Sequence, residues 1–395
     1  LEPGTLIRAI LLLDQSQDWE DFRHALSYWD APSQNVVYAD VEGNIGYQSP
    51  GRIPIRAAGD GRMPVPGWTG EYDWVDTIPY DDLPRSFNPD QGYVVTANNA
   101  VVGPDFPYLL THDWSEGYRA QRIVDLIEGD ESITIADVET FHGDSAVLYA
   151  GELLPHLLEL SSDDPQLGQA LELLGQWDGQ AVRDSAGAAI FTAFHIQLAD
   201  RVFADELGPQ LMERGRGAAM FALPELLAGG DDTWFDDVTT PERETRDEIL
   251  LAALGGAMAD LSDRLGEDVS SWRWGDLHTA TFENQSLGQS GIGPVERIFN
   301  RGPVATDGTM AAVNATSFSP GNPYALTALP SYRHIIDLAN LTQSVSMHTT
   351  GQSGHPFHPH YDDMIDPWRN IEYHPMLWLR QDVEADAEGT LVLEP

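Results

Sequence analysis

The sequence of 395 residues contains no cysteine and no lysine, and each absence excludes or disfavours particular kinds of protein. Without cysteine there can be no disulfide framework, no thiolate nucleophile and no cysteine-ligated metal. All 21 basic residues are arginines, and they face 63 acidic residues, so the formal net charge is −42. A surface so poor in cations disfavours binding to nucleic acid and to anionic membranes, because both require basic contacts to phosphate.

The sequence also lacks any hydrophobic run close to the roughly 18–20 apolar residues that a membrane span needs. Its hydrophobic content of 42% is nevertheless ample for a folded core. The acids are scattered over the chain as single residues and short pairs such as Asp163–Asp164 and Asp236–Asp237, and they form no single tail. We therefore predict a protein from a salt-adapted (halophilic) organism, because salt screens such self-repulsion. An acidic secreted protein from an ordinary organism is the alternative.

The hydrophobic pattern divides the chain into a strand-rich part (1–118), a helical part (119–265) and a second strand-rich part (266–395). In the first part, two short strands around Glu42–Gly43 predict a hairpin, and Ser16 is a candidate cap for the helix that follows it. Further strands are expected at Thr279–Phe282, Ala311–Asn314, Tyr332–Asp337, Gln343–Met347 and Thr390–Leu393. Strand blocks on both sides of a helical block suit a layered α+β architecture.

The stretch from Gly92 to Arg122 contains the strongest candidates for functional residues. A strand-like run from Tyr93 to Thr96 ends at the amide pair Asn98–Asn99, and a helix is expected to open at Arg119. An Asn side chain can donate to a developing oxyanion, and a nearby guanidinium can organise it. Arg122 is expected on the same helical face as Arg119. The alternative is that the two asparagines only form a turn and that Arg119 pairs with a surface acid.

Several long motifs of the sequence resemble the β subunit of the penicillin acylase family of N-terminal nucleophile hydrolases. They are GYVVTANN (Gly92–Asn99), NVVYADVEGNIGY (Asn35–Tyr47), PVPGWTGEYDW (Pro64–Trp74) and GQSGHPFHPHYDD (Gly351–Asp363), in the expected order. The resemblance implies part of an αββα four-layer fold, with the helical region as a large insertion. It covers essentially the whole chain and places its start inside the β subunit.

The resemblance implies an amidohydrolase that removes the acyl group from a linear N-acyl amide of the penicillin or acyl-homoserine lactone type. The motif match assigns Asn98 the role of oxyanion donor and Arg119 an organising role. The nucleophile would be a Ser at the start of the β subunit, upstream of Leu1, produced by autoproteolytic processing. We therefore expect another chain of the same precursor as partner, a periplasmic or secreted location, and no activity from this chain alone. The competing reading is a non-catalytic scaffold or binding subunit that retains the fold.

The resemblance implies that catalysis needs no cofactor, and it allows a structural calcium ion. A backbone carbonyl that binds calcium in the family would fall near Gly61, whereas the counterpart of an Asp ligand aligns near Leu110, which has no side-chain oxygen. We assign no metal-ligating residue on this basis.

Two other groups of residues suggest chemistry by their type alone. His355, His358 and His360 stand near Asp362–Asp363, but no helical spacing fixes them around a metal, so we expect packing and hydrogen-bonding roles. Gly143–Asp144–Ser145 spells the signature of one lipase class, which needs its Ser on a turn after a strand. Here the sequence around it is helical, and we expect Ser145 to cap a helix.

Overall fold

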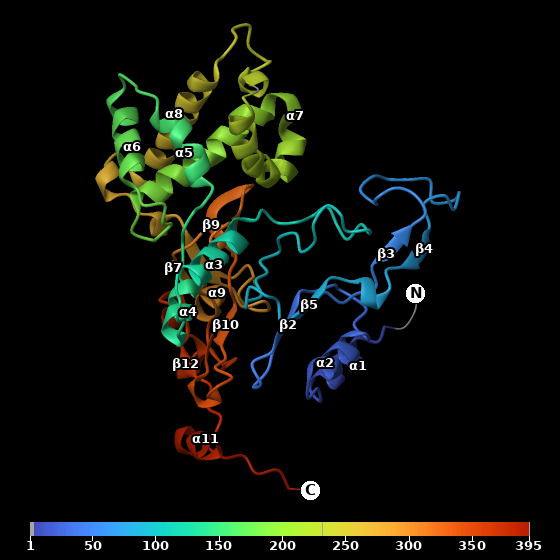
Figure 1. The fold of residues 1–395 in the computed structure, drawn as a ribbon. Coiled ribbons are helices and arrows are strands. Elements are labelled where there is room, and N and C mark those ends of the chain that lie inside the picture. The colour runs from blue at the N-terminus through green and yellow to red at the C-terminus, as the bar shows by residue number, and fades with distance from the viewer. Residues whose placement is uncertain (1–3, 231, 395) are drawn as a thin grey trace. The chain divides into compact units, whose positions relative to one another are not determined.

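The computed structural model describes residues 4–230 and 232–394, and the chain falls into two compact units. The first unit contains the residues up to Ala120 together with Asp337–Leu341. The second contains Gln121–Ile336 and the chain from Thr342 onward. Figure 1 shows both as mixtures of helices and small sheets.

The first unit combines two helices with two small antiparallel sheets. One sheet has the strand order β1-β2-β5 and the other pairs β3 with β4. The elements are α1 (Leu6–Leu13), α2 (Trp19–Leu26), β1 (Val36–Ala39), β2 (Ile45–Gln48), β3 (Pro54–Arg56), β4 (Trp74–Thr77) and β5 (Arg85–Phe87). The predicted hairpin is confirmed, because Val36 pairs with Gln48 and Ala39 with Ile45.

Local side chains explain how this unit is built. The Asp40 carboxylate accepts the backbone N–H groups of Glu42 and Asn44, which closes the hairpin turn. On the apolar side, Phe22 and Tyr38 pack in one buried cluster that joins α2 to β1. The expected cap at Ser16 is wrong, since α2 begins after Asp18, whose side chain accepts from the backbone N–H of Asp21.

Helices dominate the first part of the second unit. They are α3 (Tyr118–Glu128), which begins at the end of the first unit, α4 (Ile135–His142), α5 (Ala150–Leu158), α6 (Pro165–Gln176), α7 (Ala186–Gly229) and α8 (Arg246–Leu265). Helices α5 to α8 gather into one bundle, with α7 and α8 in the most extensive contact (Figure 1). Thr134 opens α4 with a capping box, which it forms with Asp137. Helix α7 is broken at Gly208, where φ is 71°.

The rest of the second unit holds short antiparallel pairings and small helices. The elements are β6 (Thr279–Phe282), α9 (Gly293–Phe299), β7 (Arg301–Ala305), β8 (Ser317–Ser319), β9 (Asn322–Ala328), β10 (Tyr332–Ile335), β11 (Val345–His348), α10 (Ile365–Arg369), β12 (His374–Pro375) and α11 (Arg380–Asp386). Strand β6 pairs with β7, β8 with β9, and β10-β11-β12 form a sheet.

Two strand predictions in this unit are wrong. Ala311–Asn314 forms a turn, in which the Asn314 side chain donates to the Asp307 carbonyl and accepts from Arg333. Thr390–Leu393 is exposed and lies in no strand of the described chain. The periodicity at both places is that of a strand, but a strand exists only where a second backbone pairs with it.

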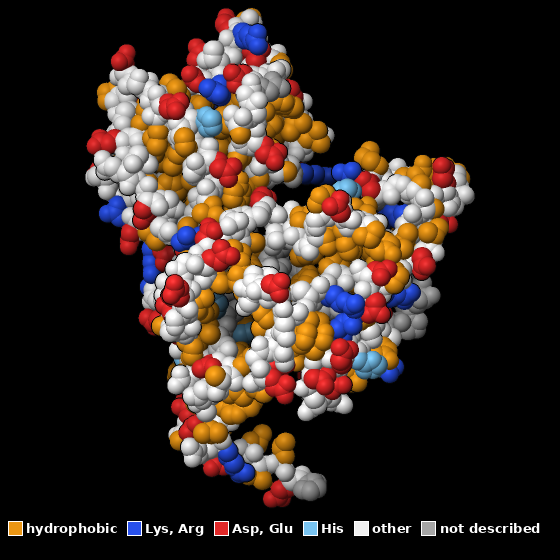
Figure 2. All heavy atoms as spheres, in the orientation of Figure 1, with side chains coloured by type: hydrophobic (Ala, Val, Ile, Leu, Met, Phe, Trp, Pro, Cys, Tyr) orange, Lys and Arg blue, Asp and Glu red, His pale blue; other side chains and the backbone are white. Residues whose placement is uncertain are grey.

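The surface reflects the composition. Figure 2 shows Asp and Glu side chains dispersed over the visible face and not gathered in one patch. Among the described residues, no helix combines the length and apolar character required to cross a bilayer.

Candidate functional site

The site predicted from the sequence centres on the turn at Asn98. The preceding residues, Tyr93 to Thr96, belong to no strand of the described chain, so the predicted strand is wrong for this chain. The backbone turns at Asn98, where φ is 63°. Asparagine tolerates this left-handed conformation better than other residues with a side chain, which explains the residue type at this position.

The structure brings Asn98 and Arg119 together within the first unit. One guanidinium nitrogen of Arg119, Nη2, donates to the Asn98 Oδ1 atom at 2.8 Å and to the Ala97 carbonyl at 2.9 Å. A guanidinium can only donate, so the atom that it contacts on Asn98 must be the oxygen. The amide therefore has a fixed orientation in which its Nδ2–H₂ group points away from Arg119.

This geometry leaves a hydrogen-bond donor available on Asn98. Its backbone carbonyl accepts from the Ser115 N–H at 2.9 Å, and its Oδ1 is taken by Arg119. Within the described residues, Nδ2 has no hydrogen-bond partner. Ala97 is only 8% exposed whereas Asn98 is exposed on this chain, so the turn is anchored on one side and presents the amide on the other.

Arg119 is partly buried, and among the described residues no carboxylate forms an ion pair with it, so the alternative of a surface ion pair is wrong. Burial lowers the pKa of Arg119, and the negative charge of Glu116 opposes this shift. An arginine stays protonated under such conditions, so the guanidinium is a fixed positive charge next to the amide. The arrangement places a neutral donor beside a cation, two kinds of group that can stabilise an oxyanion.

Arg122 does not belong to this site. Its Nε donates to Asp144 Oδ1 at 3.0 Å and its Nη2 to Asp144 Oδ2 at 2.7 Å, a bidentate pair within the second unit. This pairing raises the pKa of Arg122. The spacing of three residues between the two arginines suggested a shared role, but each has its own partners.

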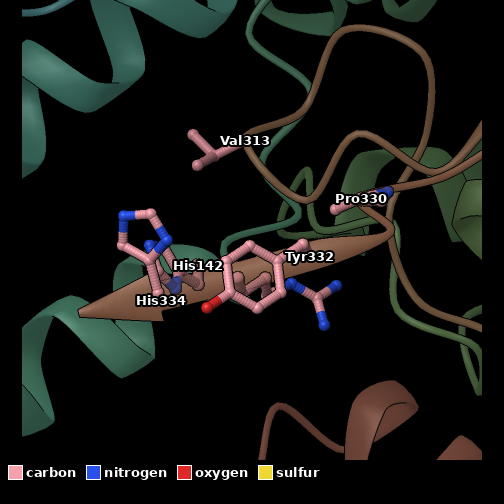
Figure 3. Close-up of a pocket in the computed structure, with 6 residues that line it drawn as sticks. His142, Val313, Pro330, Tyr332 and His334 are labelled. Carbon is pink, nitrogen blue, oxygen red and sulfur yellow. The ribbon is translucent and has the colours of Figure 1, made fainter. Parts of the chain in front are cut away.

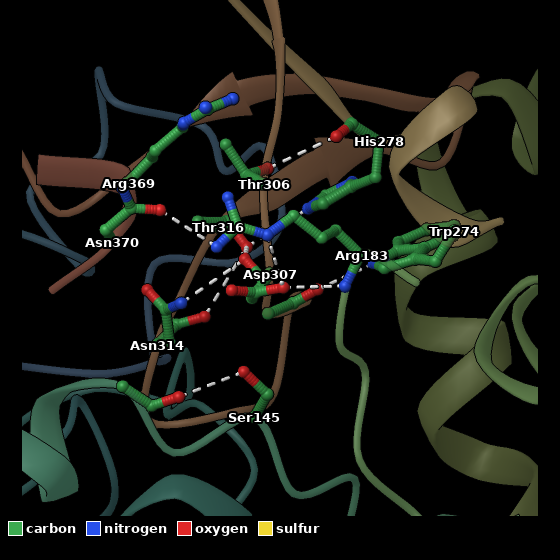
Figure 4. A network of polar contacts seen from close by, with 12 residues as sticks. Ser145, Arg183, Trp274, His278, Thr306, Asp307, Asn314, Thr316, Arg369 and Asn370 are labelled. Carbon is green, nitrogen blue, oxygen red and sulfur yellow. Dashed lines mark hydrogen bonds and ion pairs between the residues drawn. The ribbon is translucent and has the colours of Figure 1, made fainter. Parts of the chain in front are cut away.

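Ser145 is a buried structural residue. It is 1% exposed, and its hydroxyl donates to the Gly143 carbonyl at 3.1 Å (Figure 4). In the adjoining network, the Asn314 amide and the Thr316 hydroxyl both donate to the Asp307 carbonyl, which ties these loop residues together. In the part of the chain that the structure describes, no imidazole bonds to Ser145, so the lipase reading lacks its base. The expected cap is also wrong, because Ser145 caps neither α4 nor α5.

The histidine-rich loop makes local hydrogen bonds, as predicted. His360 pairs with Asp363 at 2.6 Å and with Glu388 at 3.0 Å, and these contacts raise the pKa of His360 to about 9. His358 accepts the backbone N–H of His360 at 3.1 Å. The two carboxylates bond to opposite nitrogens of the His360 ring, and in residues 4–230 and 232–394 no three His, Asp or Glu side chains are arranged to hold a metal ion.

The residues near Gly61 do not fit a calcium ion. The Asp60 carboxylate is already paired with Arg62 at 2.6 Å and lies 3.2 Å from His112, and the Arg62 contact lowers the pKa of Asp60 to about 2. Leu110 offers no side-chain oxygen. Since calcium needs several oxygen ligands, this part of the chain supplies too few.

A hollow of about 480 Å³ lies beside the Asn98 turn, within the first unit. Its walls come from both sides of that turn and from the neighbouring sheet, and none of the lining side chains is charged. The lining residues are Tyr47, Ser86, Gln91, Val94, Val95, Asn99, Ala100, Val101, Val102 and Gly103. An uncharged, partly polar hollow next to an amide donor can accommodate an organic molecule.

A second hollow of about 340 Å³ lies in the other unit, between α4 and β10. His142, Val313, Tyr332 and His334 surround it (Figure 3). Arg333, which is 6% exposed, also lines it, but two of its nitrogens are bonded to the Trp368 carbonyl and to Asn314. These contacts make Arg333 a structural tie, and no sequence-predicted site residue lies here.

Comparison with known proteins gives consistent matches. Residues 1–385 match the family model described as penicillin amidase. The acyl-homoserine lactone acylase QuiP of Pseudomonas aeruginosa is 30% identical over 377 residues, covering 86% of this chain and 43% of that protein. The penicillin acylase 2 proenzyme of Pseudomonas sp. strain SE83 is 30% identical over 383 residues, covering 93% and 47%. This chain therefore spans about half the length of the curated relatives that it matches.

The fold is similar to that of a thermostable penicillin G acylase from Alcaligenes faecalis. The TM-score is 0.67 at 22% sequence identity, and the match covers 99% of this chain and 73% of that one. At this sequence identity, the similarity shows the fold alone. It confirms the predicted N-terminal nucleophile hydrolase fold.

Proposed function

The chain belongs to the penicillin amidase family, and we propose that it is the larger part of the β subunit of an amidohydrolase that cleaves the acyl group from a linear N-acyl amide. Candidate substrates are of the acyl-homoserine lactone and penicillin types, the classes that the relatives' names carry. The observation that carries the proposal is the Arg119–Asn98 contact, which holds the Asn98 amide with its N–H₂ group free.

The proposed reaction begins with attack of a serine hydroxyl on the amide carbonyl. In our proposal this Ser is the first residue of the mature β subunit and lies on a segment upstream of Leu1. Attack breaks the carbonyl π bond and leaves an oxyanion, while the hydroxyl proton passes to the α-amine of the same Ser. Asn98 Nδ2 donates a hydrogen bond to the oxyanion, whose collapse breaks the C–N bond and releases the amine with that proton. Preorganised donors of this kind stabilise the transition state more than the substrate, because the charge develops only as the bond forms.

Arg119 then has two functions. Its bond to Oδ1 prevents the amide from rotating and presenting oxygen to the oxyanion. Its fixed positive charge also favours negative charge nearby, although the protein as a whole is strongly acidic. Neither function requires a metal or an organic cofactor.

The remaining features of the proposal follow from the family. We propose that a second chain from the same precursor completes the enzyme, that processing is autoproteolytic, and that the protein acts in the periplasm or after secretion. The charge of −42 supports a salt-adapted source.

Replacing Asn98 by Ala in the complete processed protein tests the proposal. With an acyl-homoserine lactone and a phenylacetyl amide as substrates, kcat should fall by about 10²–10³ while KM changes little, because the lost bond forms only in the transition state. Asn88→Ala is a matched control, since Asn88 also has a positive φ (46°) and bonds to the backbone of Ile45. A non-catalytic scaffold would show no hydrolysis of either substrate before or after the change.

A further inference from the structure

The turn at Asn98 is held by a second amide whose role the proposed mechanism does not use. Asn99 points back along the chain, and its Oδ1 accepts the backbone N–H of Ala97 at 3.0 Å. Its Nδ2 donates to the carbonyl of Ala100 at 3.0 Å. One side chain therefore bonds to the backbone both before and after Asn98.

The conformation of Asn98 needs such support. A residue with a side chain at φ = 63° lies in a sparsely populated region and costs free energy relative to an extended or helical one. Such a conformation persists only where the surroundings impose it. The Ala97 N–H and the Ala100 carbonyl, which flank Asn98, are both bonded to the Asn99 side chain.

Asn99 and Arg119 fix different parts of the same residue. Arg119 binds the Asn98 side chain and the Ala97 carbonyl, whereas Asn99 binds only backbone groups on either side. Arg119 thus sets which atom of the amide faces outward. Asn99 sets where the α-carbon that carries the amide lies.

We propose that Asn99 is a positioning residue for the oxyanion donor: its carboxamide clamps the turn so that Asn98 Nδ2 stands where the charge develops. This inference rests on the proposed function. It also assigns the Ala97 N–H to Asn99, so that this backbone group is occupied and does not itself donate to the oxyanion.

Side-chain chemistry explains why asparagine is needed at this position. Aspartate would still accept from the Ala97 N–H, but it would face the Ala100 carbonyl with a second acceptor and add a negative charge beside the oxyanion. Alanine would remove both bonds and leave the turn to relax. An amide supplies both an acceptor and a donor on one short planar group.

The test compares Asn99→Ala, Asn98→Ala and the double variant in the complete processed protein. For Asn99→Ala we expect kcat to fall by about tenfold to 10²-fold with KM nearly unchanged, as for a misplaced catalytic group. Asn88→Ala again serves as the control, because it removes a comparable pair of hydrogen bonds, to Ile45 and Asn44, in the same unit. It should lower the melting temperature similarly but leave kcat unaffected.

The double variant decides between positioning and general damage. If Asn99 acts only through Asn98, adding Asn99→Ala to Asn98→Ala should cost no further kcat. The inference is overturned if Asn99→Ala has wild-type kcat, or if it reduces kcat by the same factor in both backgrounds. If Asn98→Ala itself has wild-type kcat, the proposed function fails instead.

Discussion

Replacing Arg119 tests how far the orientation of one amide controls the reaction. Arg119→Met removes the charge and both hydrogen bonds but keeps an unbranched side chain of helical propensity. The structure shows what is lost: the bonds of 2.8 Å to Asn98 Oδ1 and 2.9 Å to the Ala97 carbonyl. Hydrogen bonds from a charged donor contribute about 1.5–3 kcal/mol each.

The effect on stability should be smaller than the sum of both bonds. Asn98 is exposed, so water can replace the donor at Oδ1. Ala97 is buried, and its carbonyl would be left without the guanidinium, which costs about 1–3 kcal/mol. We therefore expect Arg119→Met to have a lower melting temperature in calorimetry, with a decrease that corresponds to the Ala97 carbonyl alone.

The effect on catalysis follows from the freedom of the Asn98 amide. The Arg119 bond favours the correct orientation by about 1.5–3 kcal/mol, a preference of about 10- to 150-fold. Without it both orientations become similarly populated, and flipping alone would cost only about twofold in kcat. If the Asn98 amide also loses its position in Arg119→Met, kcat should fall further, by about tenfold to 10²-fold.

The charge and hydrogen-bonding type of the replacement side chain predict the order of kcat among variants of Arg119. Arg119→Lys keeps a cationic donor and should lose the least kcat. Arg119→Glu replaces the donor by an acceptor, which should attract Nδ2 and turn Oδ1 outward, so kcat should fall as far as in Asn98→Ala, by about 10²–10³. Steady-state kinetics on folded, purified variants gives the order. Equal kcat in the Met and Glu variants, or wild-type kcat in either, would refute the role of Arg119 in orienting the amide.

Three further predictions concern other parts of the chain. The melting temperature should rise steadily from low to molar salt, where the screening length falls to about 3 Å, and a flat series would remove the idea of salt adaptation. The contacts of His360 with Asp363 and Glu388 raise the pKa of His360 from 6.5 to about 9, so their stabilising effect is fully present below about pH 6.5 and lost as the pH rises through about 9. Proteolysis of the chain end around Glu388 should therefore accelerate with pH over that interval in the wild type but not in His360→Gln. Ser145→Ala should leave kcat/KM unchanged and cost about 1 kcal/mol of stability, and loss of turnover would restore the lipase reading.

The sequence was sufficient to predict those elements that depend on local interactions. The hairpin between Val36 and Gln48 follows from β-branched residues around a Gly turn. The family and its fold follow from long motifs with a fixed order, because a motif of many residues carries more information than any single propensity. The same motif match predicts the roles of Asn98 and Arg119, which the kinetic measurements above would test.

The sequence misled where pairing depends on a distant backbone. Tyr93 to Thr96, Ala311–Asn314 and Thr390–Leu393 all have strand composition, yet none lies in a strand of the described chain. Composition shows that a segment can adopt a strand conformation. Whether a strand forms depends on a neighbouring backbone, whose position cannot be predicted from the local sequence. Arg119 and Arg122 were expected on one helical face, but that spacing did not predict their partners, because the partners lie on distant segments.

Residue types in their order along the chain were enough to identify the family and the fold and to predict two site residues. The contacts between those residues became visible only in the folded chain. It placed Arg119 on the oxygen of Asn98 and Asn99 on the backbone around it. The Arg119 contact joins residues 21 positions apart, so its geometry is set by the packing of the unit. The Asn99 contacts lie within the turn itself, but residue types alone did not show which backbone groups its amide would bond.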